Sequence, residues 1–232
     1  TLNAIVAEAF CEAADVLEKA DNFETAVHDL IKEYMSKHQR IIFNGNGYSD
    51  EWVTEAEKRG LPNIKSMIEA ANTLTSEKAV ALFEKFGIYT KAELESREEI
   101  IYETYAKTIN IEALTMIDMA GKQIIPAVVK YSKVLADTVN SVKAAGGDAS
   151  VQTELLKTVS KKLAVMQKAL IKLEKEEAKG RAMTDAKAQA FFYKDTVKTI
   201  MEELGAPADE LEMIVDKEIW PIPTYGELMF EV

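Results

Sequence analysis

The residues best suited to acid-base or metal chemistry are two histidines and a large set of carboxylates. A carboxylate-bridged di-iron site needs Glu-x-x-His pairs that face one another inside a helical bundle. Thr25 stands three positions before His28, and Met35 stands three before His38, so neither histidine has this partner. Both histidines lie in amphipathic patterns without the poised nucleophile that a catalytic triad needs. We therefore predict no catalytic residue and no metal site within this chain.

One loop could bind an anion. Backbone amides freed by glycine beside a helix N-terminus can cradle a phosphate or a carboxylate. The alternative, which we favour, is that the loop binds nothing. Gly45 and Gly47 would then adopt positive φ in a tight connection against which Tyr48 and Trp52 pack. Gly45-Asn-Gly47 is followed by Tyr-Ser-Asp, so the loop lacks the dinucleotide-binding fingerprint. The candidate residues, which precede Asp50, are Asn44, Gly45, Asn46, Gly47, Tyr48 and Ser49.

A second group of polar residues interrupts an apolar stretch, and its members are Asn110, Glu112, Thr115 and Asp118. Buried polar groups must be paired, so these residues could form an interface network. A simpler account places Asp118 beside Lys122, and Glu103 beside Lys107, as acid-first i,i+4 pairs on an exposed strip. We favour the simpler account for the two ion pairs and leave the role of Glu112 open.

Composition narrows the class of protein. The chain has 232 residues, of which 47% are hydrophobic and 29% charged, as in ordinary globular domains. Its net charge of −11 disfavours nucleic acid and anionic lipid as partners.

Cys11 is the single cysteine, which suits a small core residue in a reducing compartment. No apolar run approaches the roughly 20 residues of a membrane span, so we expect a cytoplasmic protein. Because the helical pattern begins directly after Thr1, we also expect a piece of a longer chain.

Apolar residues at spacings of 3 and 4 predict an all-α protein, a multi-helix bundle that forms one domain over residues 1–232. Thr90 and Glu93 have the form of a capping box. Thr184 should cap a late helix that Gly205 and Pro207 end. A short extended piece is expected from Arg40, and a non-helical tail from Trp220 to Gly226. The expected helices cover residues 2–20, 23–38, 50–58, 64–71, 76–86, 91–145, 185–204 and 208–217.

The longest helix carries two features. Pro126 removes a backbone donor, so the helix should be kinked there without ending. The stretch before Pro126 is apolar almost all round, which suits a helix buried on most sides. After Pro126 the apolar residues form a narrow stripe that a second stripe matches beyond the turn at residues 145–148. We predict a protruding antiparallel helical hairpin over residues 127–178, followed by a break at residues 179–182.

Four stretches together resemble one family. They are Leu2-Asn-Ala-Ile-Val-Ala-Glu8, Arg40-Ile-Ile-Phe-Asn-Gly-Asn-Gly-Tyr-Ser-Asp-Glu-Trp52, Thr108-Ile-Asn-Ile-Glu-Ala-Leu-Thr-Met-Ile-Asp-Met-Ala120 and Trp220-Pro-Ile-Pro-Thr-Tyr-Gly226. In this order they are similar to the C-terminal helical region of type III glutamine synthetases. The match extends over essentially the whole chain.

The resemblance implies a parent enzyme that joins ammonia to glutamate through a γ-glutamyl phosphate, using ATP and a divalent metal, Mg or Mn. It implies a catalytic sheet shared between neighbouring subunits of a homo-oligomer. The catalytic residues of the family lie upstream of Thr1, so none transfers to this chain, which should be inactive alone. Its helices would support the sheet and the assembly. The alternatives are a free-standing scaffold that binds partner helices through the hairpin, and an independent enzyme with an unrecognised site.

Overall fold

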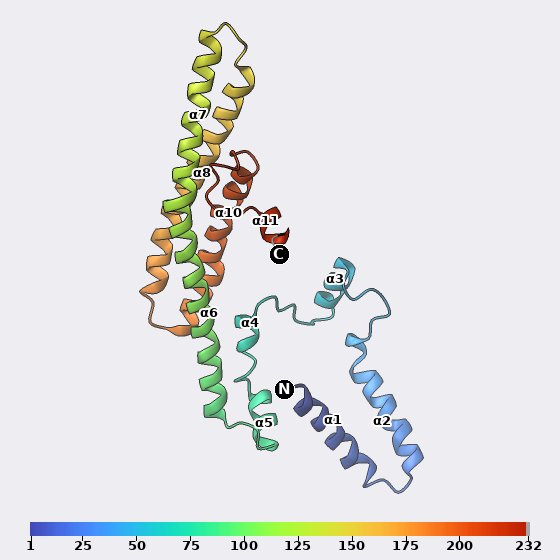
Figure 1. The fold of residues 1–232 in the computed structure, drawn as a ribbon. Coiled ribbons are helices and arrows are strands. Elements are labelled where there is room, and N and C mark those ends of the chain that lie inside the picture. Colours follow the sequence, from blue (N-terminus) through green and yellow to red (C-terminus); the bar gives the residue numbers. More distant parts are fainter. Residues whose placement is uncertain (231–232) are drawn as a thin grey trace. The chain divides into compact units, whose positions relative to one another are not determined.

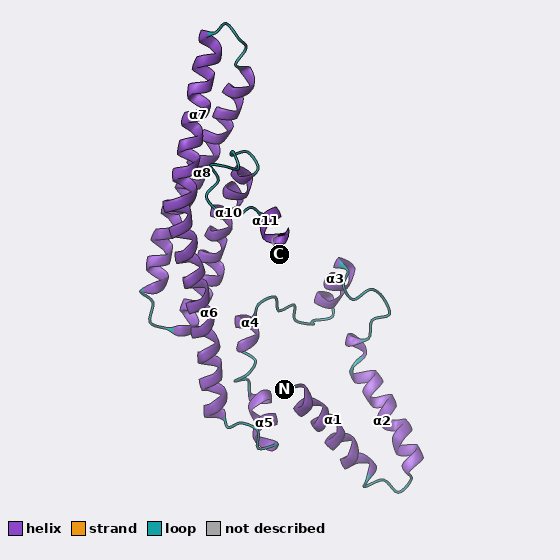
Figure 2. Ribbon diagram, viewed as in Figure 1, coloured by secondary structure: helices purple, strands orange, loops and turns teal. Residues whose placement is uncertain are grey.

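The fold is all-α, as the apolar spacing predicts. The computed structural model describes residues 1–230, and these contain helices, turns and loops but no strand (Figure 2). The chain divides within its longest helix into two compact units, Thr1–Ile101 and the part from Tyr102 onward. The single-domain organisation expected above stays a prediction. Across the described residues, no helix combines the length and apolar character that crossing a bilayer demands.

Unit 1 is built from short helices (Figure 1). Its elements are α1 (Leu2–Leu17), α2 (Phe23–Lys37), the 3-10 turn η1 (Gln39–Ile41), α3 (Asp50–Lys58), α4 (Met67–Ala71), α5 (Glu77–Lys85) and the start of α6 (Lys91–Met119). A small core joins α1, α5 and α6 through Ala4, Phe83 and Leu94. Lys85 adds an ion pair with Glu8 of α1, at 2.6 Å.

Local signals place the ends of these helices close to where the sequence predicts them. Ser49, Ser66 and Ser76 accept hydrogen bonds from backbone amides as N-caps. The Thr90–Glu93 capping box is confirmed: the Thr90 amide donates to the Glu93 carboxylate at 2.8 Å, and the Glu93 amide donates to Thr90 Oγ1 at 3.3 Å. The extended piece expected from Arg40 starts later than predicted: Arg40 and Ile41 belong to the 3-10 turn η1, and Ile42 has extended backbone.

Unit 2 is a bundle of long helices. After α6 come the π-helical segment η2 (Ala120–Ile124), α7 (Ile125–Ala144), α8 (Ser150–Arg181), α9 (Ala186–Phe192), the π-helical segment η3 (Tyr193–Val197), α10 (Lys198–Glu212) and α11 (Tyr225–Phe230). Helices α7 and α8 form the predicted antiparallel hairpin, and α10 packs along α8 (Figure 1). The seam of the hairpin buries Val128, Leu135, Val159, Met166 and Leu173.

The disturbance expected at Pro126 takes the form of a π-helical turn. Pro126 has no N–H to donate one turn back, and the turn just before it is widened so that the Ile125 amide donates to the Ala120 carbonyl. The helix therefore continues from α6 through η2 into α7 (Figure 1).

Three expectations near the C-terminal end are wrong. Gly180 lies inside α8, so the break starts at Ala182. Asp185, not Thr184, caps α9, since its carboxylate accepts from the Ala188 amide at 2.7 Å. Pro207 is buried within α10 and does not end it, because Leu204 and Leu211 on either side are held in the core.

The tail also departs from the sequence prediction. Thr224 and Glu227 form a reciprocal cap that starts α11, so helix resumes directly after the two prolines. Trp220, at the start of the tail, is buried in the unit 2 core.

Candidate functional site

The predicted loop from Asn44 to Ser49 connects η1 with α3, and its polar groups bond mainly to one another. Asn46 Oδ1 accepts from the Tyr48 amide at 3.0 Å. The Ser49 hydroxyl donates to the Asn46 carbonyl at 2.9 Å and accepts from the Trp52 amide at 3.4 Å. Such side-chain-to-backbone bonds fix a turn and the start of a helix. The loop is therefore ordered by its own residues.

Gly45 has a role that the sequence did not indicate. Among residues 1–230, positive φ occurs at Gly60, Gly87 and Gly146, so the left-handed conformation expected at Gly45 and Gly47 is wrong. A Cβ at Gly45 would meet Cζ of the Phe43 ring at 2.6 Å. Glycine is needed there because the aromatic ring folds back over the backbone.

An aromatic stack, extended by a guanidinium group, covers this connection. The Phe43 and Trp52 rings stack with centroids 4.4 Å apart, whereas Tyr48, expected to help pack the loop, is fully exposed. Arg59 lies over the Trp52 ring, 5.6 Å from its centroid, and its Nη1 donates to the Ile42 carbonyl at 2.8 Å. Arg59 thus ties α3 to the chain that enters the loop.

The electrostatics of the loop do not favour an anion. Asp50 and Glu51 occupy the first turn of α3, next to the amides that an anion would use. The pKa of Glu55 is lowered by its hydrogen bond from Arg59, so a third carboxylate stays charged on the same helix. Binding by the Asn44–Ser49 loop stays a prediction.

The polar residues of α6 follow the simpler of the two accounts. The ion pairs Glu103–Lys107 and Asp118–Lys122 are both present on exposed side chains. The Thr115 hydroxyl donates to the Ile111 carbonyl of its own helix at 2.8 Å. The Asn110 side-chain oxygen, in contrast, is buried and accepts no hydrogen bond within the described residues.

The α6 surface corrects a further expectation. A helix buried on most sides was expected, yet Ile111 is 65% exposed and Leu114 is 38% exposed. The opposite face of the helix packs into the unit 2 core through Ala106, Ile109 and Ala113. One apolar face of α6 is therefore open within the described part of the chain.

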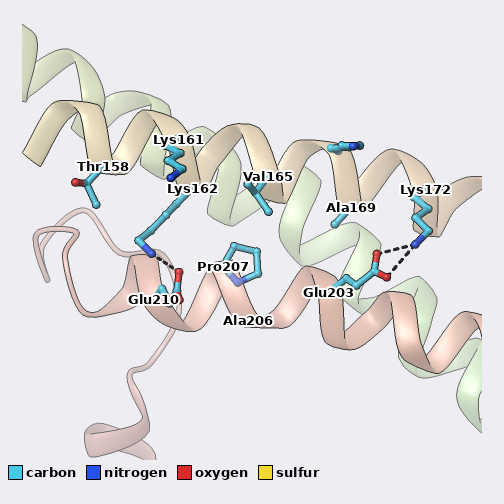
Figure 3. A pocket seen from close by; sticks show the side chains of 11 residues that line it. Thr158, Lys161, Lys162, Val165, Ala169, Lys172, Glu203, Ala206, Pro207 and Glu210 are labelled. Atoms are coloured by element: carbon cyan, nitrogen blue, oxygen red, sulfur yellow. Dashed lines mark hydrogen bonds and ion pairs between the residues drawn. The ribbon is translucent and has the colours of Figure 1, made fainter.

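A groove of about 910 Å³ runs between α8 and α10 (Figure 3). Its floor is apolar, with Val165 and Ala169 on α8 and Pro207 on α10. Lysines from α8 rim it. Lys172 reaches across to Glu203 at 2.7 Å, and Lys162 pairs with Glu210 (Figure 3). Lys161 and Lys168 also line the groove. Two glutamates face four lysines, so the groove carries a positive charge.

This positive groove belongs to a wider asymmetry of charge along the chain. Residues 125–181, which make up α7, α8 and their turn, contain eleven lysines and arginines against six aspartates and glutamates, a net charge of +5. The remainder of the chain therefore carries −16 of the total of −11. The prediction from sequence rested on the net charge of the whole chain and did not single out the hairpin lysines. A count of charge per segment would have found them.

Within the described residues, no three side chains of His, Cys, Asp or Glu gather in an arrangement that could hold a metal ion. His28 and His38 lie on α2 and at its C-terminal end, and both are exposed. The donor set that a divalent metal would need therefore does not fit the described part of this chain.

The chain matches the family model described as the glutamine synthetase C-terminal domain over residues 26–143. It is 40% identical over 214 residues to a glutamine synthetase of Butyrivibrio fibrisolvens, an alignment that covers 91% of this chain and 31% of that protein. It is 34% identical over 244 aligned residues to the type-3 glutamine synthetase of Dictyostelium discoideum, covering 99% of this chain and 32% of that protein. The chain thus spans about a third of the length of these relatives.

Proposed function

Because this chain belongs to the glutamine synthetase C-terminal domain family, we propose that it is the helical, non-catalytic C-terminal region of a type III enzyme. The parent protein would join ammonia to glutamate with the hydrolysis of ATP. The role of this region would be to support the catalytic sheet and the assembly of subunits. The parent would work in the cytoplasm as a homo-oligomer.

The two parts of the parent chain would have different roles. ATP and the divalent metal, Mg or Mn, would bind to the remaining two thirds of the parent. The described residues of this region hold no group of three His, Cys, Asp or Glu side chains that could bind a metal. The chain alone is expected to form no glutamine from ATP, glutamate and ammonia.

The observation that carries the proposal is the open apolar face of α6. Ile111 and Leu114 are one turn apart on a helix whose other side is in the core, and exposed apolar side chains of this kind mark contact surfaces. We assign this face to the contact with the catalytic part of the same parent chain. Burying both side chains there would contribute roughly 2 to 4 kcal/mol.

Co-expression of this chain with the rest of its parent, as two separate polypeptides, tests the proposal. The two pieces should co-purify and form glutamine, while neither piece alone should do so. Ile111→Asp with Leu114→Asp should abolish co-purification, because two carboxylates would be buried without partners.

Val129→Asp with Val134→Asp is the matched control, since both valines are exposed on α7, outside the α6 face. This variant should still co-purify. Glutamine formation by the isolated chain, or equal loss of co-purification in the control, would refute the proposed role.

A further inference from the structure

We infer that the groove between α8 and α10 is the docking site for α1 of a second copy of this chain. The inference rests on the proposed role in subunit assembly and names the contact that it would use. Each copy would offer both halves of the contact, so that copies join head to tail.

The groove combines the two features that an amphipathic helix needs. Val165, which is 52% exposed, stands in the floor between Ala169 and Pro207 and presents an apolar surface. Lys161 and Lys168 stand on the rim, and the two glutamates of the groove pair with other lysines. An entering helix must therefore bring apolar side chains for the floor and carboxylates for the rim.

Helix α1 has this chemistry. Leu2, Val6 and Phe10 recur every four residues and are exposed, while Ala4 on the opposite side is buried in unit 1. The helix has sixteen residues and no lysine or arginine, and its three charged residues are acidic. Glu12 is exposed beside this stripe, Asp15 is exposed on the side of Ala4 and adds to the negative charge of the helix, and Glu8 is bound to Lys85.

The two surfaces also agree in length. At 1.5 Å per residue, α1 is about 24 Å long. The groove-lining stretch of α8 from Thr158 to Lys172 is about 21 Å long. One copy of α1 can therefore lie along the whole row of lysines. Opposite charge on the two surfaces favours this pairing over self-pairing of α1, which would bring acidic residues together.

Sedimentation velocity of the full chain over a range of concentrations tests the inference. Association should appear at about 0.05 M salt and weaken markedly at about 0.5 M, where exposed charges are screened. The groove variant Lys161→Glu with Lys168→Glu should weaken association roughly tenfold or more. The helix variant Glu12→Lys with Asp15→Lys should do the same.

Mixing the two variants gives the decisive result. Each variant repels itself, but the acidic groove of one matches the basic α1 of the other, so the mixture should associate again. Lys130→Glu with Lys143→Glu, which changes the hairpin charge equally outside the groove, should leave association unchanged. Circular dichroism establishes that every variant is folded.

Two results would overturn the inference: a chain that stays monomeric at all concentrations, or a mixture of variants that fails to associate. The proposed function is read separately, from co-purification with the rest of the parent. A groove variant that still co-purifies but no longer self-associates would support both statements, and one that self-associates normally would refute only the docking site.

Discussion

The rings of Phe43 and Trp52 stack at an angle of 26°, and Gly45 leaves the space that Phe43 occupies. This stack joins the two ends of the loop from Asn44 to Ser49. It adds to the side-chain hydrogen bonds of Asn46 and Ser49 that order the same loop.

Phe43→Ala should expose one face of the Trp52 indole and destabilise the connection by about 1 to 2 kcal/mol, since an aromatic pair adds to the area it buries. The measurement is the emission wavelength of Trp52 in a Trp220→Phe background, where it is the single indole. We expect a red shift and a lower denaturation midpoint. Tyr48→Ala is the control, because its side chain is fully exposed and its loss should cost less than about 0.5 kcal/mol. A larger effect from Tyr48 than from Phe43 would contradict the described packing.

Acid should loosen the C-terminal tail through Glu227. Its pKa is lowered to about 2 by the hydrogen bond from Lys217 and by those from the amide and hydroxyl of Thr224. A carboxyl whose pKa is depressed in the folded state contributes stability above its unfolded value of roughly 4.3, and this is lost as the pH falls towards 2.

The measurement is Trp220 fluorescence as a function of pH in a Trp52→Phe background. The wild-type tail should change between about pH 4 and pH 2, and Glu227→Gln should remove that transition, because the amide does not titrate. A transition of the same size in Glu227→Gln would assign the acid response to other groups.

Two helical glycines should respond to alanine in opposite directions. A Cβ at Gly180 would approach Cζ of the buried Tyr193 ring at 3.1 Å, so Gly180→Ala should destabilise unit 2 by about 1 to 2 kcal/mol. A Cβ at Gly205 meets only the flexible end of Met116 at 3.9 Å, so Gly205→Ala should stabilise α10 by about 0.5 to 1 kcal/mol. Urea denaturation followed by Trp220 fluorescence measures both. Equal shifts in the same direction would contradict the packing of Tyr193 on α8.

The sequence predicted the features that depend on local pattern. Apolar spacing indicated the helices, the Thr90–Glu93 capping box indicated the start of the longest one, and the matched stripes around the turn at residues 145–148 indicated the hairpin. These signals act over a few residues, so a single sequence is sufficient to read them.

Features that depend on tertiary packing were not predicted. Pro207 was expected to end a helix, because propensity alone cannot register that the core holds both neighbouring turns. Gly45 was assigned a left-handed turn, because the sequence does not reveal that Phe43 folds over it. Propensity likewise predicts an α-helical turn where η3 is widened at Tyr193.

The same limit applies to the candidate sites. The groove between α8 and α10 was not predicted. Its lysines all lie on α8, and the sequence does not show that α10 packs beside them and forms the other side of the groove. For the loop from Asn44 to Ser49, the sequence identified the unusual segment and places Asp50 and Glu51 directly after it, but it does not reveal the stack of Phe43 on Trp52.

The widened turn at η2 sets the rotation of α7 relative to α6 about their common helix axis. One extra residue in a helix turns everything after it by about 100° about the axis. In the continuous helix formed by α6, η2 and α7, Ala106 and Ala113 can therefore pack into the bundle before the turn, and Leu135 and Val139 can face α8 after it. Removing a single residue between 120 and 124 would rotate α7 about its axis and expose its apolar stripe to water. The number of residues in this short stretch, more than their identity, determines which face of α7 meets α8.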